Sequence, residues 1–163
     1  MCEASKGGID LGKNEIQVHA PKAGRKPKIK PYEHRTQYHE TDPQGIIHHA
    51  NYVKWMEEAR MNLLDQLGMG YRQMEELEII SPVLSLSIEY RGAVKFDETV
   101  MIETKLLSYD GLGMEIAYRI YDKETGEDKA VARSKHGFLN KSGIPISLNR
   151  IYPELDTKFF EFK

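Results

Sequence analysis

The sequence has little cysteine and no long apolar run. Its one cysteine, Cys2, excludes a disulfide framework and is typical of the reducing cytoplasm, where we expect this protein. No stretch approaches the roughly 18 apolar residues of a membrane-spanning helix, and no secretory signal is visible. The formal net charge of −2 gives no overall attraction to nucleic acid or anionic lipid. We therefore expect a globular protein that binds neither nucleic acid nor a membrane.

The charge is nevertheless distributed unevenly. Residues 1–30 hold seven Lys/Arg and three Asp/Glu, a net of +4, which leaves −6 for residues 31–163. No aromatic residues interleave these basic residues to stack on bases. We interpret residues 1–30 as a basic extension, either flexible or an arm that lies on a neighbour. Residues 31–163 have the length of a single domain.

The hydrophobic pattern predicts one long helix and several strands. Apolar residues recur at spacings of three and four from about Asn51 to Leu67, and a short second helix is expected over Tyr71–Leu77. Alternating patterns predict strands over 32–38, 84–90, 100–106, 112–120 and 130–138, with hairpin turns at 110–111 and 125–126 and a final helix or arm over 152–162. This order predicts an α+β domain in which the helix covers one face of an antiparallel sheet. We expect an exposed sheet edge at the first or last strand.

The segment from Tyr38 to Tyr52 concentrates the chemistry. It places Asp42, a proline–glycine turn and two histidines directly before the start of the long helix. The start of a helix offers unpaired backbone N–H groups and a positive dipole end, which can hold a carbonyl while an acid or water attacks it. Taken locally, Asp42 before Pro43 is also an ordinary turn or capping residue.

The two histidines do not indicate a metal site. Side chains of adjacent residues diverge on a helix and point to opposite faces of a strand, so His48 and His49 chelate poorly as a pair. Neither an HExxH pattern nor a Cys/His cluster is present. We expect no metal and no other cofactor. His49 either positions Asp42 or water with its side chain, or donates only its backbone N–H.

More than ten spaced positions together resemble the signature of the 4-hydroxybenzoyl-CoA thioesterase branch of the hot-dog acyl-CoA thioesterases. The resemblance covers about residues 32–145, and its motif reads Tyr38-x-x-Thr41-Asp42-x-x-Gly45-x-x-x-His49-x-Asn51-Tyr52-x-x-Trp55-x-Glu57-x-Ala59-Arg60. It implies the hot-dog fold, in which an antiparallel sheet wraps around one long central helix.

The resemblance also implies roles for individual residues. Asp42 matches the catalytic carboxylate, either as a nucleophile or as a general base. His49 matches a residue at the helix start whose backbone N–H polarises the thioester carbonyl, and Tyr38 matches a tyrosine that lines the pocket. Gly45 and Asn51, which share the motif, are assigned to substrate binding.

The function implied is hydrolysis of an acyl-CoA thioester to a free acid and coenzyme A. On or after the last predicted strand, Arg133 and Lys135 either meet the coenzyme A phosphates or belong to a solvated strand face. Two alternatives stay open: hydrolysis of acyl groups on an acyl carrier protein, which the basic extension would attract, and a non-catalytic module that binds acyl thioesters. Hot-dog relatives place their active sites between subunits, so we expect a homodimer or homotetramer.

Overall fold

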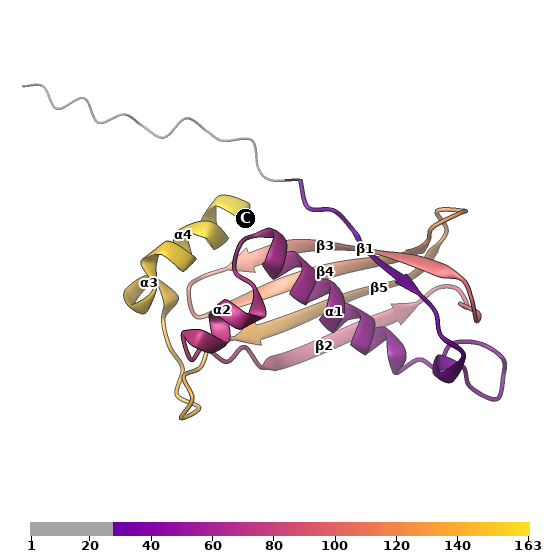
Figure 1. Ribbon diagram of the computed structural model, residues 1–163, viewed down its shortest axis with the longest axis horizontal. Coiled ribbons are helices and arrows are strands. Elements are labelled where there is room, and N and C mark those ends of the chain that lie inside the picture. The colour runs from indigo at the N-terminus through magenta and orange to yellow at the C-terminus, as the bar shows by residue number, and fades with distance from the viewer. Residues whose placement is uncertain (1–27) are drawn as a thin grey trace, which may run out of the picture.

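The computed structural model describes residues 28–163 and consists of one antiparallel sheet with a long helix across one of its faces (Figure 1). The predicted extension lies outside the described residues except at its end, where Lys30 exchanges two backbone hydrogen bonds, of 2.9 and 3.0 Å, with the Gln66 side chain. The elements are β1 (Tyr32–Arg35), a 3₁₀ turn η1 (Tyr38–Glu40), α1 (Asn51–Gln66), α2 (Tyr71–Glu76), β2 (Val83–Tyr90), β3 (Thr99–Tyr109), β4 (Gly113–Asp122), β5 (Asp128–Gly137), α3 (Leu148–Ile151) and α4 (Pro153–Phe162).

The strands follow the order β1-β3-β4-β5-β2, and every neighbouring pair is antiparallel. Both predicted hairpin turns are present. In the first, Asp110 Oδ1 accepts the N–H groups of Leu112 and Gly113, both at 2.9 Å, while Gly111 adopts a φ of +84°. The expected open edge is found at β1, the first strand, whereas the last strand, β5, lies inside the sheet because β2 crosses to its far side. The edges are β1 and β2.

Helix α1 forms the centre of the core. Its buried face carries Trp55, Met56, Leu63 and Leu64, which pack on the inner faces of the strands. Not every apolar residue of α1 lies on this face, since Val53 is 41% exposed whereas Trp55 is fully buried. Residue Ala50 occupies the N-cap position, and no side chain caps the start of the helix. None of the helices in the described chain has the length and apolar character of a membrane span.

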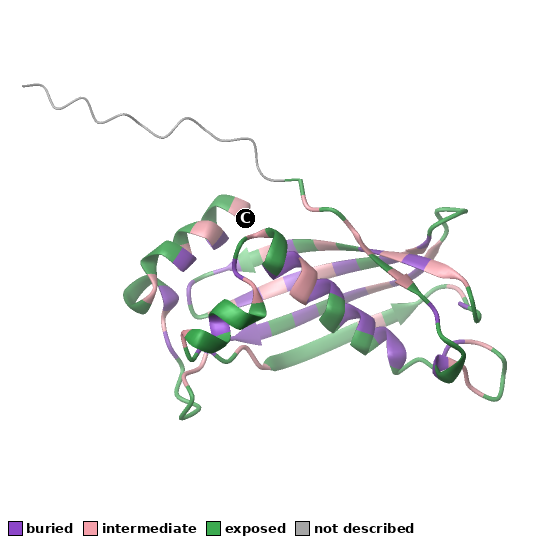
Figure 2. Cartoon of the chain, in the orientation of Figure 1, coloured by how far each residue is buried: buried purple, intermediate pink, exposed green. Residues whose placement is uncertain are grey.

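Strand β2 differs from the other long strands because most of it is exposed (Figure 2). Its side chains Leu84, Leu86 and Tyr90 are 66%, 40% and 46% exposed, although their alternation with polar residues predicts a buried row. The outer edge of β2 pairs with no other strand in the described chain. A single chain therefore leaves an apolar sheet edge open.

Candidate active site

The loop that carries Asp42 is closed by hydrogen bonds of its own backbone. Thr41 and Ile47 form an isolated antiparallel bridge, and the Asp42 N–H donates to the carbonyl of Ile46 at 2.9 Å. The Gly45 N–H returns to the Asp42 carbonyl at 3.0 Å, and Gly45 adopts a φ of +77°, which favours glycine. This loop ends immediately before α1, so the turn places Asp42 beside the beginning of the helix.

The half-buried carboxylate of Asp42 takes part in the turn with one oxygen only. Its Oδ1 accepts the backbone N–H of Gln44 at 2.8 Å, the contact of an Asx turn. No hydrogen bond to Oδ2 occurs within residues 28–163. Asp42 thus combines the turn role that its position before Pro43 suggests with a second oxygen that remains open to a ligand.

The start of α1 presents an open backbone donor near this carboxylate. The Asn51 N–H bonds to the carbonyl of His48 at 3.0 Å, and the Ala50 N–H bonds to His48 Nδ1 at 3.2 Å. The His49 N–H, in contrast, donates to no acceptor in the described part of the chain. The hydroxyl of Tyr90 donates to the His49 carbonyl at 3.0 Å and so ties this residue to the end of β2.

Asp42 and His49 line the same hollow, which has a volume of about 410 Å³. Tyr52 and Tyr90 form its aromatic wall, with ring centroids 5.1 Å apart in an edge-to-face arrangement, and Arg91 adds a cation. Burial raises the pKa of Tyr52 to about 12, so its phenol stays protonated at neutral pH. A carboxylate, an unpaired amide and an apolar wall with one cation therefore meet in one hollow.

The structure does not bring every predicted site residue to this hollow. Tyr38 is 76% exposed and packs edge-on against Phe96 instead of lining it. Asn51 is buried, and its side chain donates to the Glu40 carbonyl at 2.8 Å. Gly45 shapes the turn and does not line the hollow.

Neither Arg133 nor Lys135 lines the Asp42 hollow within one chain. Both are exposed on β5, where they alternate with the buried residues Ser134 and His136. Successive residues of a strand point to opposite faces, so the two cations lie on the sheet face that α1 does not cover. Their assignment to coenzyme A phosphates stays a prediction.

Sequence reasoning missed two kinds of residue near the site. Tyr52 and Tyr90 were treated as parts of a motif and a strand, although the alternating row that ends at Tyr90 could have placed it at the sheet end nearest the helix start. Glu40 was not singled out, because a charged residue in a turn gives no sequence signal that it is buried.

The rings of His48 and His49 also lie differently from the prediction. They stack with centroids 4.2 Å apart and an interplanar angle of 28°, rather than diverging. Within residues 28–163, no group of three or more His, Cys, Asp or Glu side chains is arranged to hold a metal ion.

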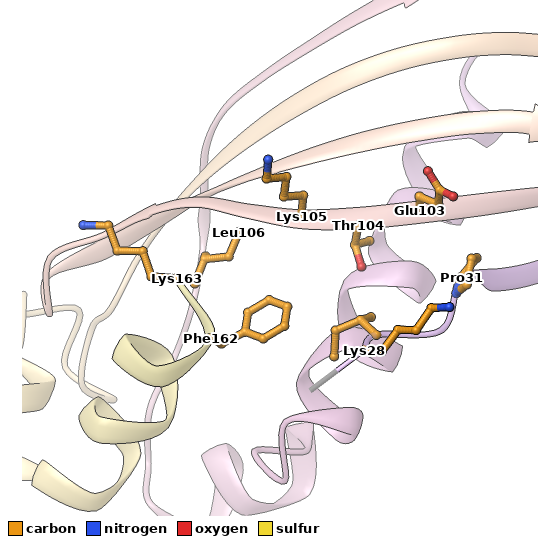
Figure 3. Close-up of a pocket in the computed structure, with 9 residues that line it drawn as sticks. Lys28, Pro31, Glu103, Thr104, Lys105, Leu106, Phe162 and Lys163 are labelled. Atoms are coloured by element: carbon orange, nitrogen blue, oxygen red, sulfur yellow. The ribbon is translucent and has the colours of Figure 1, made fainter. Parts of the chain in front are cut away.

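A second hollow, of about 600 Å³, lies between α4 and β3, where the described chain begins (Figure 3). Lys28 and Lys105 surround it together with the ring of Phe162. Glu103 is the one acidic side chain among its lining residues, and neither Asp42 nor His49 lines it. The groups that the motif predicts for thioester chemistry therefore gather in the hollow at the start of α1.

A sheet with a long helix across it, and a carboxylate beside the start of that helix, defines the hot-dog class of thioesterase folds. Residues 36–157 match the model of the thioesterase-like superfamily. The chain belongs to this family and is an enzyme of the thioesterase class.

Individual relatives agree with this assignment. The chain is 35% identical over 127 residues to YneP of Bacillus subtilis, provisionally named an acyl-CoA thioesterase, covering 77% of this chain and 91% of YneP. It superposes on the DHNA-CoA thioesterase of Staphylococcus aureus with a TM-score of 0.78 and 31% identity, over 81% of this chain and 89% of that one. A hypothetical protein of Thermus thermophilus gives a TM-score of 0.71 at 25% identity, over 78% and 98% of the two chains. The predicted hot-dog fold and family are confirmed.

Proposed function

We propose that the protein hydrolyses acyl-CoA thioesters to free acids and coenzyme A, with Asp42 as the central carboxylate. The observation that carries this proposal is the shared hollow, in which the open oxygen of Asp42 and the unpaired N–H of His49 occur together. The names of YneP and of the Staphylococcus aureus enzyme support the acyl-CoA substrate. The single cysteine, Cys2, supports a cytoplasmic location.

The chemistry follows from these two groups. The His49 N–H donates to the thioester oxygen as negative charge develops on it, and a fixed donor of this kind is typically worth about a hundred- to thousand-fold in rate. As a general base, Asp42 removes a proton from water while the water oxygen bonds to the carbonyl carbon; the C–S bond then breaks and the thiolate takes up a proton. As a nucleophile, Asp42 bonds to the carbonyl carbon itself, and water hydrolyses the mixed anhydride after the thiolate leaves.

The test is Asp42→Asn, assayed by release of free thiol from a panel of acyl-CoA esters. The asparagine oxygen keeps the contact to the Gln44 N–H, so we expect the variant to fold and its kcat to fall by about a hundredfold or more. Asp110→Asn is the matched control, because Asp110 also accepts turn amides through Oδ1 but belongs to the β3–β4 turn. Wild-type activity in Asp42→Asn would remove Asp42 from the mechanism.

Two further measurements separate the remaining alternatives. Rapid quenching and mass spectrometry of the wild-type enzyme detect an acyl group on the Asp42 peptide if this residue is the nucleophile, and none if it is a general base. Assays of the full chain on matched acyl-CoA and acyl-carrier-protein substrates decide between the two carriers. Tight binding of acyl-CoA without turnover would identify a non-catalytic binding module instead.

We further propose that the enzyme assembles as a homodimer or a homotetramer. Strand β2 offers an open edge with exposed leucines, and pairing this edge with a second copy buries them and completes its backbone hydrogen bonds. Because Tyr90 at the end of β2 lines the Asp42 hollow, such an interface would also close one side of the site.

A further inference from the structure

Glu40 is a charged residue almost wholly inside the protein, with 5% of its surface exposed. Both oxygens of its carboxylate accept hydrogen bonds. Oε1 accepts the indole N–H of Trp55 at 2.7 Å, and Oε2 accepts the backbone N–H of Gln37 at 2.6 Å. Nε2 of His34 lies 3.2 Å from Oε1 and 3.1 Å from Oε2. The carboxylate therefore joins β1, η1 and α1.

The backbone carbonyl of the same residue holds the start of the long helix. It accepts the N–H of His48 at 2.8 Å and the side-chain amide of Asn51 at 2.8 Å. Asp42 follows Glu40 by two residues, and His49 follows His48 directly. The two groups proposed for the chemistry are thus both within two residues of atoms that are fixed to Glu40.

Stability alone does not account for a charged residue at this buried position. A buried carboxylate is costly to desolvate, and apolar residues of similar volume often replace buried charges without loss of stability. A charged acceptor, however, fixes its donors in direction and distance, which apolar packing does not. Catalytic rates depend on such precise placement, since a misplacement of about 1 Å can lower the rate by about a hundredfold.

We propose that Glu40 is a positioning residue, which holds the Asp42 carboxylate and the His49 N–H at the separation that the thioester requires. Glu40 does not line the hollow. The inference rests on the proposed function of Asp42, but its structural part, the fixing of the loop by Glu40, can be measured without any turnover.

The test compares Glu40→Gln with Asp122→Asn. Glutamine has nearly the volume of Glu40, but its side-chain NH₂ replaces one carboxylate oxygen. That NH₂ group would then face the N–H of Gln37 or of Trp55, so at least one of these hydrogen bonds is lost. Asp122 is a matched control because it too is a buried carboxylate that accepts backbone N–H groups in a turn, those of Glu124 at 2.9 Å and Thr125 at 2.7 Å. It lies in the β4–β5 turn, outside the Asp42 loop. Trp55→Phe, which removes one donor and leaves the charge, carries the test if Glu40→Gln does not fold.

We expect Glu40→Gln to lower kcat by about tenfold to a hundredfold, with KM within about threefold of wild type, at a temperature where both proteins are folded. Asp122→Asn should lower the melting temperature by a similar amount and leave kcat unchanged. In hydrogen–deuterium exchange, the peptide that spans residues 41–51 should exchange faster in Glu40→Gln and not in Asp122→Asn.

Hydrogen–deuterium exchange and kcat test different parts of the proposal, and either measurement can contradict it. Unchanged exchange over residues 41–51 would overturn the positioning role, whatever the activity. Faster exchange with a wild-type kcat would also overturn it, because the loop would then be held for stability alone. If Asp42→Asn is fully active, the proposed function fails, and the exchange measurement still reports whether Glu40 fixes the loop.

Discussion

The carboxylate of Glu40 and the indole of Trp55 form a buried hydrogen bond of 2.7 Å between the turn before the site loop and the second turn of α1. Neither side chain reaches solvent to an appreciable extent, so neither has water as a substitute partner. The indole ring also lies against His34, with centroids 4.9 Å apart, which places the strand, the turn and the helix around one charge.

Replacing Trp55 by phenylalanine removes the indole donor and keeps an aromatic ring in the core. We expect a loss of about 2 kcal/mol in the free energy of unfolding, because a hydrogen bond to a charged group is broken in a buried place. Urea unfolding of the two proteins measures the difference. Tyr52→Phe, which keeps a ring beside Trp55, serves as the control for aromatic packing; equal stability of Trp55→Phe and wild type would show that this bond contributes nothing.

The hydrogen bonds of Glu40 lead us to expect that the free energy of unfolding depends on pH in the acid range. Burial by itself raises the pKa of Glu40, but the hydrogen bonds from Gln37, Trp55 and His34 outweigh burial and hold the pKa below the ordinary value of 4.5. The ionised carboxylate therefore stabilises the fold above about pH 4.5, and this contribution is lost as the pH falls toward the lowered pKa. The stability difference between wild type and Glu40→Gln should shrink as the pH falls below about 4.5. A difference that does not vary with pH would contradict this account.

His136 predicts a second dependence, in the range nearer neutrality. It lies buried under α1, where its Nε2 contacts Ser134 Oγ at 2.7 Å and its Nδ1 has no partner. Burial, with a smaller contribution from the charge of Arg60, lowers the pKa of His136 from 6.5 to about 4. The unfolded chain therefore binds a proton that the folded protein rejects, and stability should fall by about 3 kcal/mol as the pH drops from 6.5 to 4.

The measurement is the free energy of unfolding across that range for wild type and His136→Leu, in which this part of the slope should vanish. His39→Gln is the control, since His39 is exposed, and it should keep the wild-type slope. An identical slope in all three proteins would exclude His136 as its source.

The exposed edge of β2 leads us to expect that a charged residue introduced there disrupts the assembly. Leu86 is 40% exposed in one chain, and we expect a second copy to bury it. Leu86→Lys should convert the assembly to monomers in light scattering at micromolar concentration, because a lysine on an edge strand opposes pairing. Leu112→Lys is the control: Leu112 is 56% exposed and belongs to the β3–β4 turn rather than to β2, and its variant should keep the wild-type mass. A wild-type protein that is itself monomeric would refute the proposed assembly.

The backbone conformation of Gly45 leads us to expect different losses of stability from two substitutions at this position. Its φ of +77° strains any other residue, but no atom lies within 4 Å of an added Cβ. Asparagine adopts this conformation more readily than alanine, so Gly45→Ala should lose about 1 kcal/mol of stability and Gly45→Asn less. Thermal unfolding gives the order. Equal losses in both variants would show that the backbone conformation is not the reason for glycine here.

The sequence determined most of the local structure. The apolar spacing after Asn51 predicted α1 to within one residue at its C-terminal end, since Gly68, with a φ of +69°, ends the helical conformation. The pairs Asp110-Gly111 and Thr125-Gly126 predicted both hairpins, because turn chemistry is encoded in neighbouring residues. The Asp42 loop was likewise visible as a motif of closely spaced residues.

Only the tertiary structure decided what lies between distant segments. It placed β2 beyond β5, where the β2 leucines stay exposed, and it placed Arg133 and Lys135 on the uncovered sheet face. It also buried Glu40 among hydrogen-bond donors from three parts of the chain. Periodicity describes which residues share a face, but not which strand a face will meet. From the sequence, a charged residue is expected to be exposed, because the partners that would allow its burial are distant along the chain.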